Sequence, residues 1–193
     1  MRRIILASRS KARQKLLRKA KLSFKAVVPN VKEALSSKAG VRKLVVANAL
    51  KKAENIAKKF NSGIIIAADT VVLTGNKIIG KPRSKKEAFK ILKYLSGRWQ
   101  WVYTGLAVIN IDNKKVFSGV EKTRIYLEPL TGRQIKQYAA VNKAGGFDIQ
   151  GKGNRFITRI EGSYSNVVGL PLKKLAKLLR KAGVNIESSL FQL

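Results

Sequence analysis

One carboxylate lies inside an apolar stretch of the sequence, where burial of an unpaired charge would cost free energy. Asp69 follows Ile64-Ile65-Ile66-Ala67-Ala68 and precedes Thr70-Val71-Val72. A carboxylate among such residues must be paired, metal-bound or placed at a strand end that faces a cleft. Gly80-Lys81-Pro82 follows closely and offers a cation. Asp69 is therefore a candidate catalytic or metal-binding residue, and a hydrogen-bonded structural aspartate is the alternative.

A second candidate site joins the first predicted strand to the first predicted helix. The segment Ala7-Ser8-Arg9-Ser10-Lys11-Ala12-Arg13 combines hydroxyls, cations and the free N–H groups of a helix N-terminus. That combination suits phosphate. The segment is neither a P-loop nor a dinucleotide-binding fingerprint, so a capped helix with surface cations is the alternative.

A glycine-rich segment at 143–153 is the third candidate. Its glycines allow close backbone approach, and Gln150 offers the donor and the acceptor that recognition of a base requires. A turn-rich connection is the alternative. Trp99, Trp101 and Tyr103 alternate along a predicted strand, where we expect them to pack on the sheet rather than to stack on bases.

Composition limits the chemistry and the partners. The 193 residues include 41 Lys+Arg, 10 Asp+Glu and neither Cys nor His, with a net charge of +31. Thiol and imidazole chemistry are excluded, which leaves carboxylates, cations, hydroxyls and backbone groups. A surface this basic attracts nucleotides and nucleic acid non-specifically, and a merely solvated surface is the alternative. No apolar run approaches the ~20 residues of a spanning helix, so we expect a cytoplasmic protein without a membrane partner.

The positions of apolar residues predict a mixture of strands and helices. Strands are expected at 3–8, 24–28, 63–73, 99–111, 116–127, 155–160 and 166–168, and helices at 10–20, 41–60, 85–95, 131–138 and from Pro171 to just before Gly183. Ser10 is an expected N-cap, and Ser84 and Thr131 begin capping-box patterns. The pattern indicates an α/β protein with a mixed sheet. We expect one domain over 1–185 and a C-terminal tail at 186–193.

From about Ile4 to Gly183 the chain resembles the Maf family of nucleoside triphosphate pyrophosphatases. Four groups of segments carry the resemblance: Leu6 to Arg13; Ala68-Asp69-Thr70-Val71-Val72 with Gly80-Lys81-Pro82; Leu95-Ser96-Gly97-Arg98 with Tyr103-Thr104-Gly105; and Lys143-Ala144-Gly145 through Ile149-Gln150-Gly151 with Val168-Gly169-Leu170-Pro171-Leu172. The resemblance implies an elongated mixed sheet flanked by helices, with two lobes around a central cleft. It also implies hydrolysis of a nucleoside triphosphate to the monophosphate and pyrophosphate with Mg²⁺ or Mn²⁺.

The same resemblance assigns roles to particular residues. Asp69 matches the catalytic carboxylate, Glu33 an acid of the metal site, and Lys81 a cation that contacts the triphosphate. Further substrate-binding positions are matched by Ser8, Arg13, Lys52, Thr70 and Gln150. Thr70 and Gln150 match positions linked to base choice, and Ile149-Gln150-Gly151 resembles the subgroup that acts on dTTP and UTP.

The chain also departs from the family pattern. Lys11-Ala12-Arg13 replaces the usual Pro-Arg-Arg, so Ala12 lacks an arginine linked to pyrimidine selectivity. We therefore expect a preference for dTTP and UTP that is blurred. A basic nucleic-acid-binding module without catalysis and a catalytically dead nucleotide-binding relative are the alternatives, and a homodimer is a possible assembly.

Overall fold

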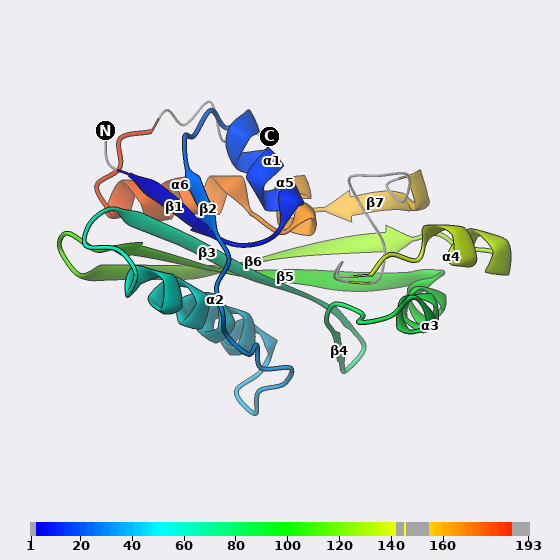
Figure 1. Cartoon of the computed structure of the whole chain (residues 1–193). Helices are drawn as coiled ribbons and strands as arrows, with labels where there is room; N and C mark the ends of the chain where they lie inside the picture. The colour runs from blue at the N-terminus through cyan, green and yellow to red at the C-terminus, as the bar shows by residue number, and fades with distance from the viewer. Residues whose placement is uncertain (1–2, 142–144, 146–154, 187–193) are drawn as a thin grey trace.

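The computed structural model describes residues 3–141, 145 and 155–186 (Figure 1). These residues form a seven-stranded mixed sheet in the order β2-β1-β3-β5-β6-β7, with β4 paired to β3. The strands are β1 (Ile4–Ala7), β2 (Lys25–Val27), β3 (Ile64–Thr74), β4 (Lys77–Ile79), β5 (Arg98–Asn110), β6 (Lys115–Leu127) and β7 (Ile157–Glu161).

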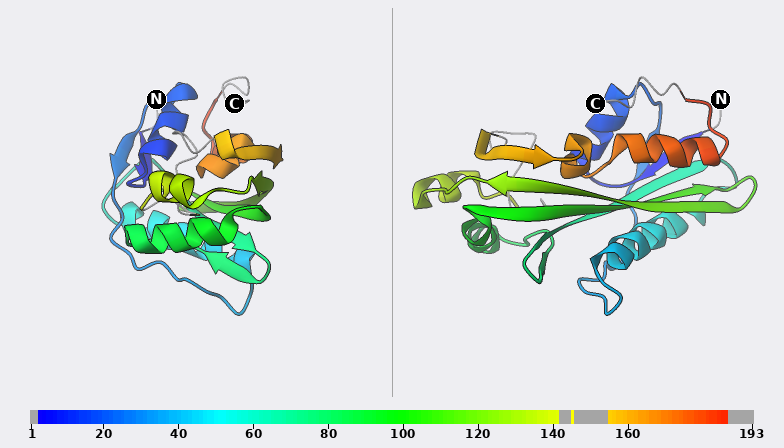
Figure 2. Two further views of the ribbon diagram at one scale, coloured as in Figure 1. Left: turned by 90° about the vertical axis from the view of Figure 1, so that its right-hand side faces the viewer. Right: turned by 180° about the vertical axis from the view of Figure 1, so that it is seen from behind.

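Helices cover both faces of the sheet. They are α1 (Lys11–Lys19), α2 (Val41–Ala57), α3 (Lys85–Leu95), α4 (Gly132–Tyr138), α5 (Tyr164–Val168) and α6 (Leu172–Lys181). The α1 and α6 helices lie on one side of the sheet and α2 on the other, while α3 and α4 lie toward the far end of the long β5–β6 hairpin (Figure 2). The predicted fold class, a mixed α/β sheet flanked by helices, is confirmed.

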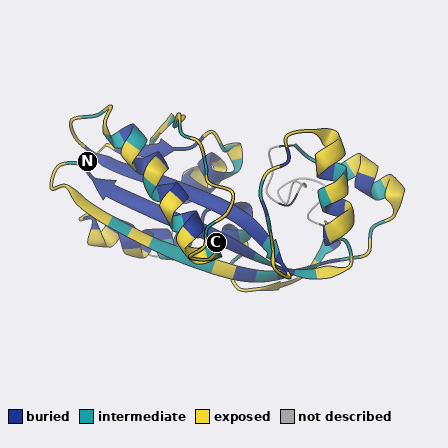
Figure 3. Ribbon diagram, turned by 90° about the horizontal axis from the view of Figure 1, so that it is seen from below, coloured by how far each residue is buried: buried dark blue, intermediate teal, exposed yellow. Residues whose placement is uncertain are grey.

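Alternation along β3 divides the apolar interior. Ile64 and Ile66 pack with residues of α1 and α6, whereas Ile65 and Ala67 pack under α2. Successive strand side chains point to opposite faces, so this alternation places Asp69 on the α2 side. Buried residues concentrate on the strands and on the inward faces of the helices (Figure 3).

A glycine lets α2 lie close to the sheet beside Asp69. In the register of β3 and β5, Asp69 lies opposite Gly105. A Cβ at Gly105 would lie 2.3 Å from the carbonyl carbon of Val45 in α2. Because backbone cannot yield at that distance, any side chain here would push α2 away. Gly105 therefore brings the buried face of α2 to the aspartate.

The predicted helices and strands agree with the structure except at two places. The strand expected at 166–168 is wrong: these residues lie in α5, where the Ser163 hydroxyl accepts from the N–H of Asn166 and Gly169 ends the helix at φ 105°. The N-cap at Ser163 and the left-handed C-cap at Gly169 outweigh the strand propensity of the β-branched residues between them. The short β4 was not predicted.

Two other predictions reach beyond the described residues. Of the glycine-rich segment at 143–153, only Gly145 is described, so Gln150 lies outside the described residues. The division into a domain at 1–185 and a tail stays a prediction. Within the described ranges, no helix combines the length and apolarity needed to cross a membrane.

Candidate active site

The candidate site lies along a free edge of β3. On this edge β1 pairs with Ile64–Ile66 and β4 pairs with Val72–Thr74, which leaves 67–71 between them. The carbonyl oxygen of Ala68 accepts from Arg13 Nη1 at 2.9 Å and from Lys52 Nζ at 3.3 Å. Buried backbone groups need partners, so the interrupted edge is completed by two cations from different helices.

Lys52 links two carboxylates at this edge. Its Nζ lies 2.6 Å from Asp69 Oδ1 and 2.7 Å from Glu33 Oε1. Lys52 and Asp69 are almost fully buried, whereas the side chain of Glu33, in the segment between β2 and α2, is 36% exposed. The structure therefore brings together three residues that the family resemblance assigned to the site from separate parts of the chain, and Asp69 is a paired buried charge.

Asn48 was missed by the sequence analysis. Its Nδ2 donates to Asp69 Oδ2 and to the Ala34 carbonyl, both at 2.9 Å, and its Oδ1 accepts from the Ala34 N–H at 2.9 Å. Asn48 therefore holds both the aspartate and the segment that carries Glu33. The available signal was that Asn48 and Lys52 are two polar residues at i and i+4 on the apolar face of α2.

These contacts decide the charge of Asp69. Burial alone would raise the pKa of its carboxyl group. The nearby Lys52 ammonium, the hydrogen bonds from Lys52 and Asn48, and the more weakly acting Arg13 together lower that pKa below its ordinary value. Asp69 is consequently ionised at neutral pH.

Lys81 lies on the open side of the same group. Its Nζ is 3.7 Å from Glu33 Oε1, and its side chain is 37% exposed. Partial burial and the positive charges of Arg13 and Lys52 lower the pKa of Lys81, while Glu33 and Asp69 oppose the shift. Lys81 is thus a cation in contact with solvent that is positioned to meet an anion.

The Arg13 guanidinium donates hydrogen bonds to other groups of the protein. Its Nε donates to the Gly169 carbonyl at 2.7 Å, and its Nη2 donates to Thr70 Oγ1 at 2.9 Å. Its Nη1 bonds to Ala68 and, at 3.4 Å, to Ser8 Oγ. Burial lowers the pKa of this guanidinium, although Asp69 and Glu33 oppose the shift. Arg13 thus joins the β1–α1 connection to β3 and to the end of α5.

Ser8 and Thr70 are both buried beside Arg13. Ser8 Oγ also accepts from the N–H of Ser10 at 3.2 Å, and Thr70 Oγ1 lies 3.0 Å from Thr104 Oγ1. In the structure both hydroxyls support Arg13. The predicted contacts of Ser8 and Arg13 with a triphosphate, and of Thr70 with a base, stay predictions.

Glu33 and Asp69 are suitable ligands for a hard divalent cation. Mg²⁺ is commonly bound through one or two carboxylates, with substrate phosphates and water completing its coordination. Among the described residues, no group of three or more Asp, Glu, His or Cys side chains gathers that could hold a metal alone. The donor set therefore fits an ion that arrives with phosphate.

Comparison with known proteins places the chain in a family. The model of the family "Maf-like protein" matches residues 3–182. A dTTP/UTP pyrophosphatase of Carboxydothermus hydrogenoformans is 45% identical over 185 residues, covering 94% of this chain and 99% of that protein. One of Methanosarcina barkeri is 41% identical over 191 residues, covering 96% and 97%.

Among solved structures, the Staphylococcus aureus Ham1 protein superposes with a TM-score of 0.48 at 17% identity, covering 94% of this chain and 100% of that one. The resemblance noted in the four groups of segments is confirmed by the family match. Because that match and relatives above 40% identity extend over nearly the whole chain, this protein belongs to the Maf-like family.

Proposed function

We propose that this protein hydrolyses nucleoside triphosphates, preferentially dTTP and UTP, to the monophosphate and pyrophosphate. Its relatives named dTTP/UTP pyrophosphatase match almost their full length. The observation that carries the proposal is the buried, ionised Asp69 held between Lys52 and Asn48 at the free edge of β3. Phosphoryl transfer depends mainly on positioning and electrostatics, which such a group supplies without His or Cys.

Asp69 orients the attacking water. The oxygen of that water bonds to the α-phosphorus, the bond from this phosphorus to the bridging oxygen breaks, and pyrophosphate leaves. A carboxylate with a lowered pKa is a weak base, so Asp69 acts chiefly by accepting a hydrogen bond that orients the water, and the proton that this water loses goes to solvent. The hydrogen bonds from Lys52 and Asn48 hold the carboxylate in one orientation.

The cations have separate tasks. Lys81, partly exposed beside Glu33, neutralises charge on the leaving pyrophosphate. Lys52 keeps the two carboxylates together, and Arg13 fixes the β1–α1 connection that carries Ser8. The free N–H groups at the start of α1 add to the positive potential there.

A divalent cation, Mg²⁺ or Mn²⁺, would be held by Glu33 and Asp69. When bound, it supplies positive charge that polarises the phosphate oxygens. Lys52, which already contacts both carboxylates, would keep them in place around it.

The test is pyrophosphate release from a panel of nucleoside triphosphates with and without added metal. We expect Asp69→Asn to lower kcat by about 100-fold or more. The matched control is Asp112→Asn, the same chemical change at a residue that accepts from the N–H of Gly63. The control should stay within about twofold of the parent. Parental rates for Asp69→Asn would refute the assignment, and nucleotide binding without turnover in the parent would identify a catalytically dead relative.

A further inference from the structure

The ends of β5, β6 and β7 carry aromatic and basic side chains that the proposed reaction does not use. Trp99 lies opposite Tyr126, which in turn lies opposite Arg159. On the same pair of strands, Trp101 lies opposite Arg124. Residues opposite one another across strands share a face of the sheet. We call the following six side chains the aromatic–basic face: Trp99, Trp101, Lys122, Arg124, Tyr126 and Arg159.

Cations of this face lie over its rings. The guanidinium carbon of Arg124 is 4.2 Å from the centroid of the Trp99 ring, and Lys122 Nζ is 4.6 Å from that of Trp101. The Trp99 and Tyr126 ring centroids are 5.4 Å apart. All three rings are only half-buried. Aromatic surface therefore stays open to solvent between side chains of positive charge, while Trp101 also packs, as expected from the sequence, against a buried cluster of Val45, Val71 and Tyr103.

An open cavity of about 820 Å³ adjoins these rings. The described residues that line it belong to strands or to the segment directly after β6: Trp99, Tyr126, Glu128, Pro129, Thr158 and Arg159. Its volume is within the range of small-molecule sites. Its aromatic floor and its arginine favour a ligand that is flat and anionic.

The charge of the surroundings decides between ligands. Among the described residues, two carboxylates, Glu128 and Glu161, lie beside the face, and Glu161 Oε2 is 3.6 Å from Arg124 Nη1. The three cations of the face exceed these two acids by one charge, and the chain as a whole carries +31. A second copy of the same chain would meet strong repulsion, whereas a polyanion would be attracted from every direction.

We propose that the aromatic–basic face binds single-stranded nucleic acid. Bases stack on Trp99, Tyr126 and the guanidinium plane of Arg124, while phosphates contact Lys122 and Arg159. Stacking on aromatic rings and on arginine is how single strands are held without sequence preference, and paired bases in a duplex do not offer their faces in this way.

The face is separate from the candidate active site. Asp69 lies opposite Gly105, and Trp99 is six residues from Gly105 along β5. Six residues of strand span about 20 Å, so the Trp99 end of the face is far from Asp69, while Lys122, opposite Tyr103, marks the end of the face nearer to it. Binding at the face can therefore be measured, and removed, without touching the residues proposed for hydrolysis.

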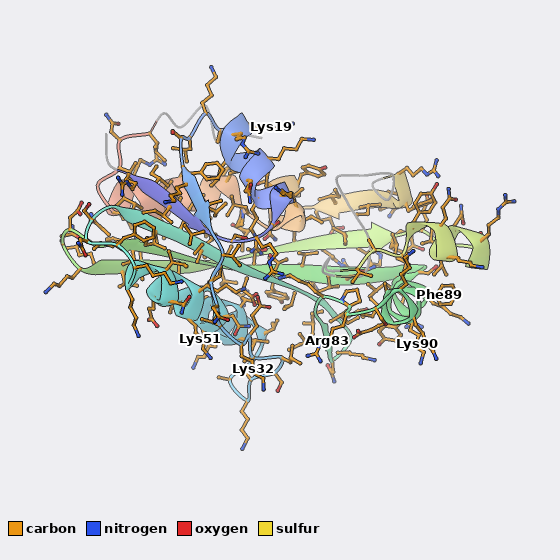
Figure 4. The ribbon with its side chains drawn as sticks, in the orientation of Figure 1. Lys19, Lys32, Lys51, Arg83, Phe89 and Lys90 are labelled. Atoms are coloured by element: carbon orange, nitrogen blue, oxygen red, sulfur yellow. The ribbon has the colours of Figure 1, made fainter. Side chains whose placement is uncertain are left out.

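Tryptophan fluorescence tests the proposal, because Trp99 and Trp101 are the two tryptophans of the sequence. Titration with an oligodeoxyadenylate of about 12 nucleotides should quench it, and affinity should fall steeply between ~50 and ~200 mM salt. The double variant Lys122→Glu/Arg159→Glu should bind about tenfold or more weakly. The matched double variant Lys19→Glu/Lys90→Glu has the same net charge, with exposed residues on α1 and α3 (Figure 4), and should change affinity less than about threefold.

A second variant keeps the test independent of charge reversal. Trp99→Leu should weaken binding about fivefold to hundredfold, measured by anisotropy of a labelled oligonucleotide, with the kcat for dTTP unchanged. Asp69→Asn should bind the oligonucleotide as the parent does, so failure of the hydrolysis assignment would be seen separately. Equal losses in the two double variants, equal affinity for duplex DNA, or self-association in sedimentation that Trp99→Leu abolishes would each overturn the proposal.

Discussion

Two regions of the sheet handle charge in opposite ways. At the free edge of β3, Asp69 and Lys52 are almost fully buried and pair with each other at 2.6 Å. At the ends of β5 and β6, Arg124 and Lys122 remain partly or fully exposed and lie over tryptophan rings. Buried charges need close partners with good geometry, whereas exposed ones keep their hydration and are free to meet a ligand. The first region is therefore built to hold a fixed geometry and the second to accept variable ligands.

The largest effect should follow from removing the cation of the buried region. Lys52→Met leaves two carboxylates facing each other without their ammonium partner. We expect the free energy of unfolding to fall by about 3 kcal/mol, at the lower end for a broken buried pair because Glu33 is partly exposed, and hydrolysis to be lost. Urea denaturation measures the first and pyrophosphate release the second.

The control for Lys52→Met is Lys51→Met. Lys51 is exposed on the same helix, and its Nζ donates to the carbonyl of Lys32 (Figure 4). Stability should change by about 0.5 kcal/mol or less. Similar losses in the two variants would show that the comparison between buried and exposed charge is wrong.

Asn48→Ala keeps the Asp69 carboxylate but removes one of the hydrogen bonds that orient it, so it tests how much activity depends on that orientation. The loss of this hydrogen bond raises the pKa of Asp69 toward its ordinary value, so the acid limb of the rate profile should move to higher pH. In the parent, stability from this carboxylate is present above the unfolded pKa of ~4 and lost as pH falls through the lower folded value. We expect kcat to fall about tenfold or more, with a smaller change in KM.

Asn55→Ala is the matched control for Asn48→Ala. Asn55 Oδ1 accepts from the N–H of Asn30, so it also links α2 to the segment before it but not to Asp69. Its pH profile should coincide with that of the parent. A shifted acid limb in this control would show that the pH dependence comes from loosening the segment between β2 and α2, and not from the lost hydrogen bond to Asp69.

Lys81→Gln should lower activity with little change in stability. The lowered pKa of Lys81 means that the fold disfavours its charged form, so at neutral pH this charge works against folding and the cost disappears only in alkali. We expect kcat/KM to fall about tenfold to hundredfold and the melting temperature to stay equal or rise slightly. Lys77→Gln, at the start of β4 just before Lys81 and with its Nζ over the Tyr94 ring, is the control and should keep parental kcat/KM.

The smallest effect concerns the base. Ala12→Arg restores the family's usual arginine, and we expect it to sharpen the preference for dTTP and UTP over CTP by roughly threefold to tenfold.

Gln150→Ala should flatten the ranking of substrates more than it slows hydrolysis of the best one. Relative kcat/KM over a nucleotide panel measures both. If purine triphosphates lead in the parent, Gln150 is not the residue that selects the base.

Local signals were sufficient for most of the fold and for the membership of the site. The serine before α1 and the threonine before α4 cap their helices as expected, because capping depends on residues within one turn. Asp69, Glu33, Lys52 and Lys81 were named from residue type and family resemblance, and the structure places them together. The α5 helix was missed because its cap, Ser163, had to outweigh residues that favour strands.

Only the tertiary structure decided how those residues are used. The contact of Arg13 with a triphosphate stays a prediction, whereas its hydrogen bonds to Gly169, Ala68 and Thr70 were not predicted, because contacts across 55 to 156 residues of sequence have no local signature. The role of Asn48 depends on the close approach of α2 to the sheet at Gly105, because this approach brings Asn48 within hydrogen-bond distance of Asp69. Residue type and local spacing determine which groups are available and which element carries them, whereas the burial and pairing that set their charge and orientation depend on which elements pack together.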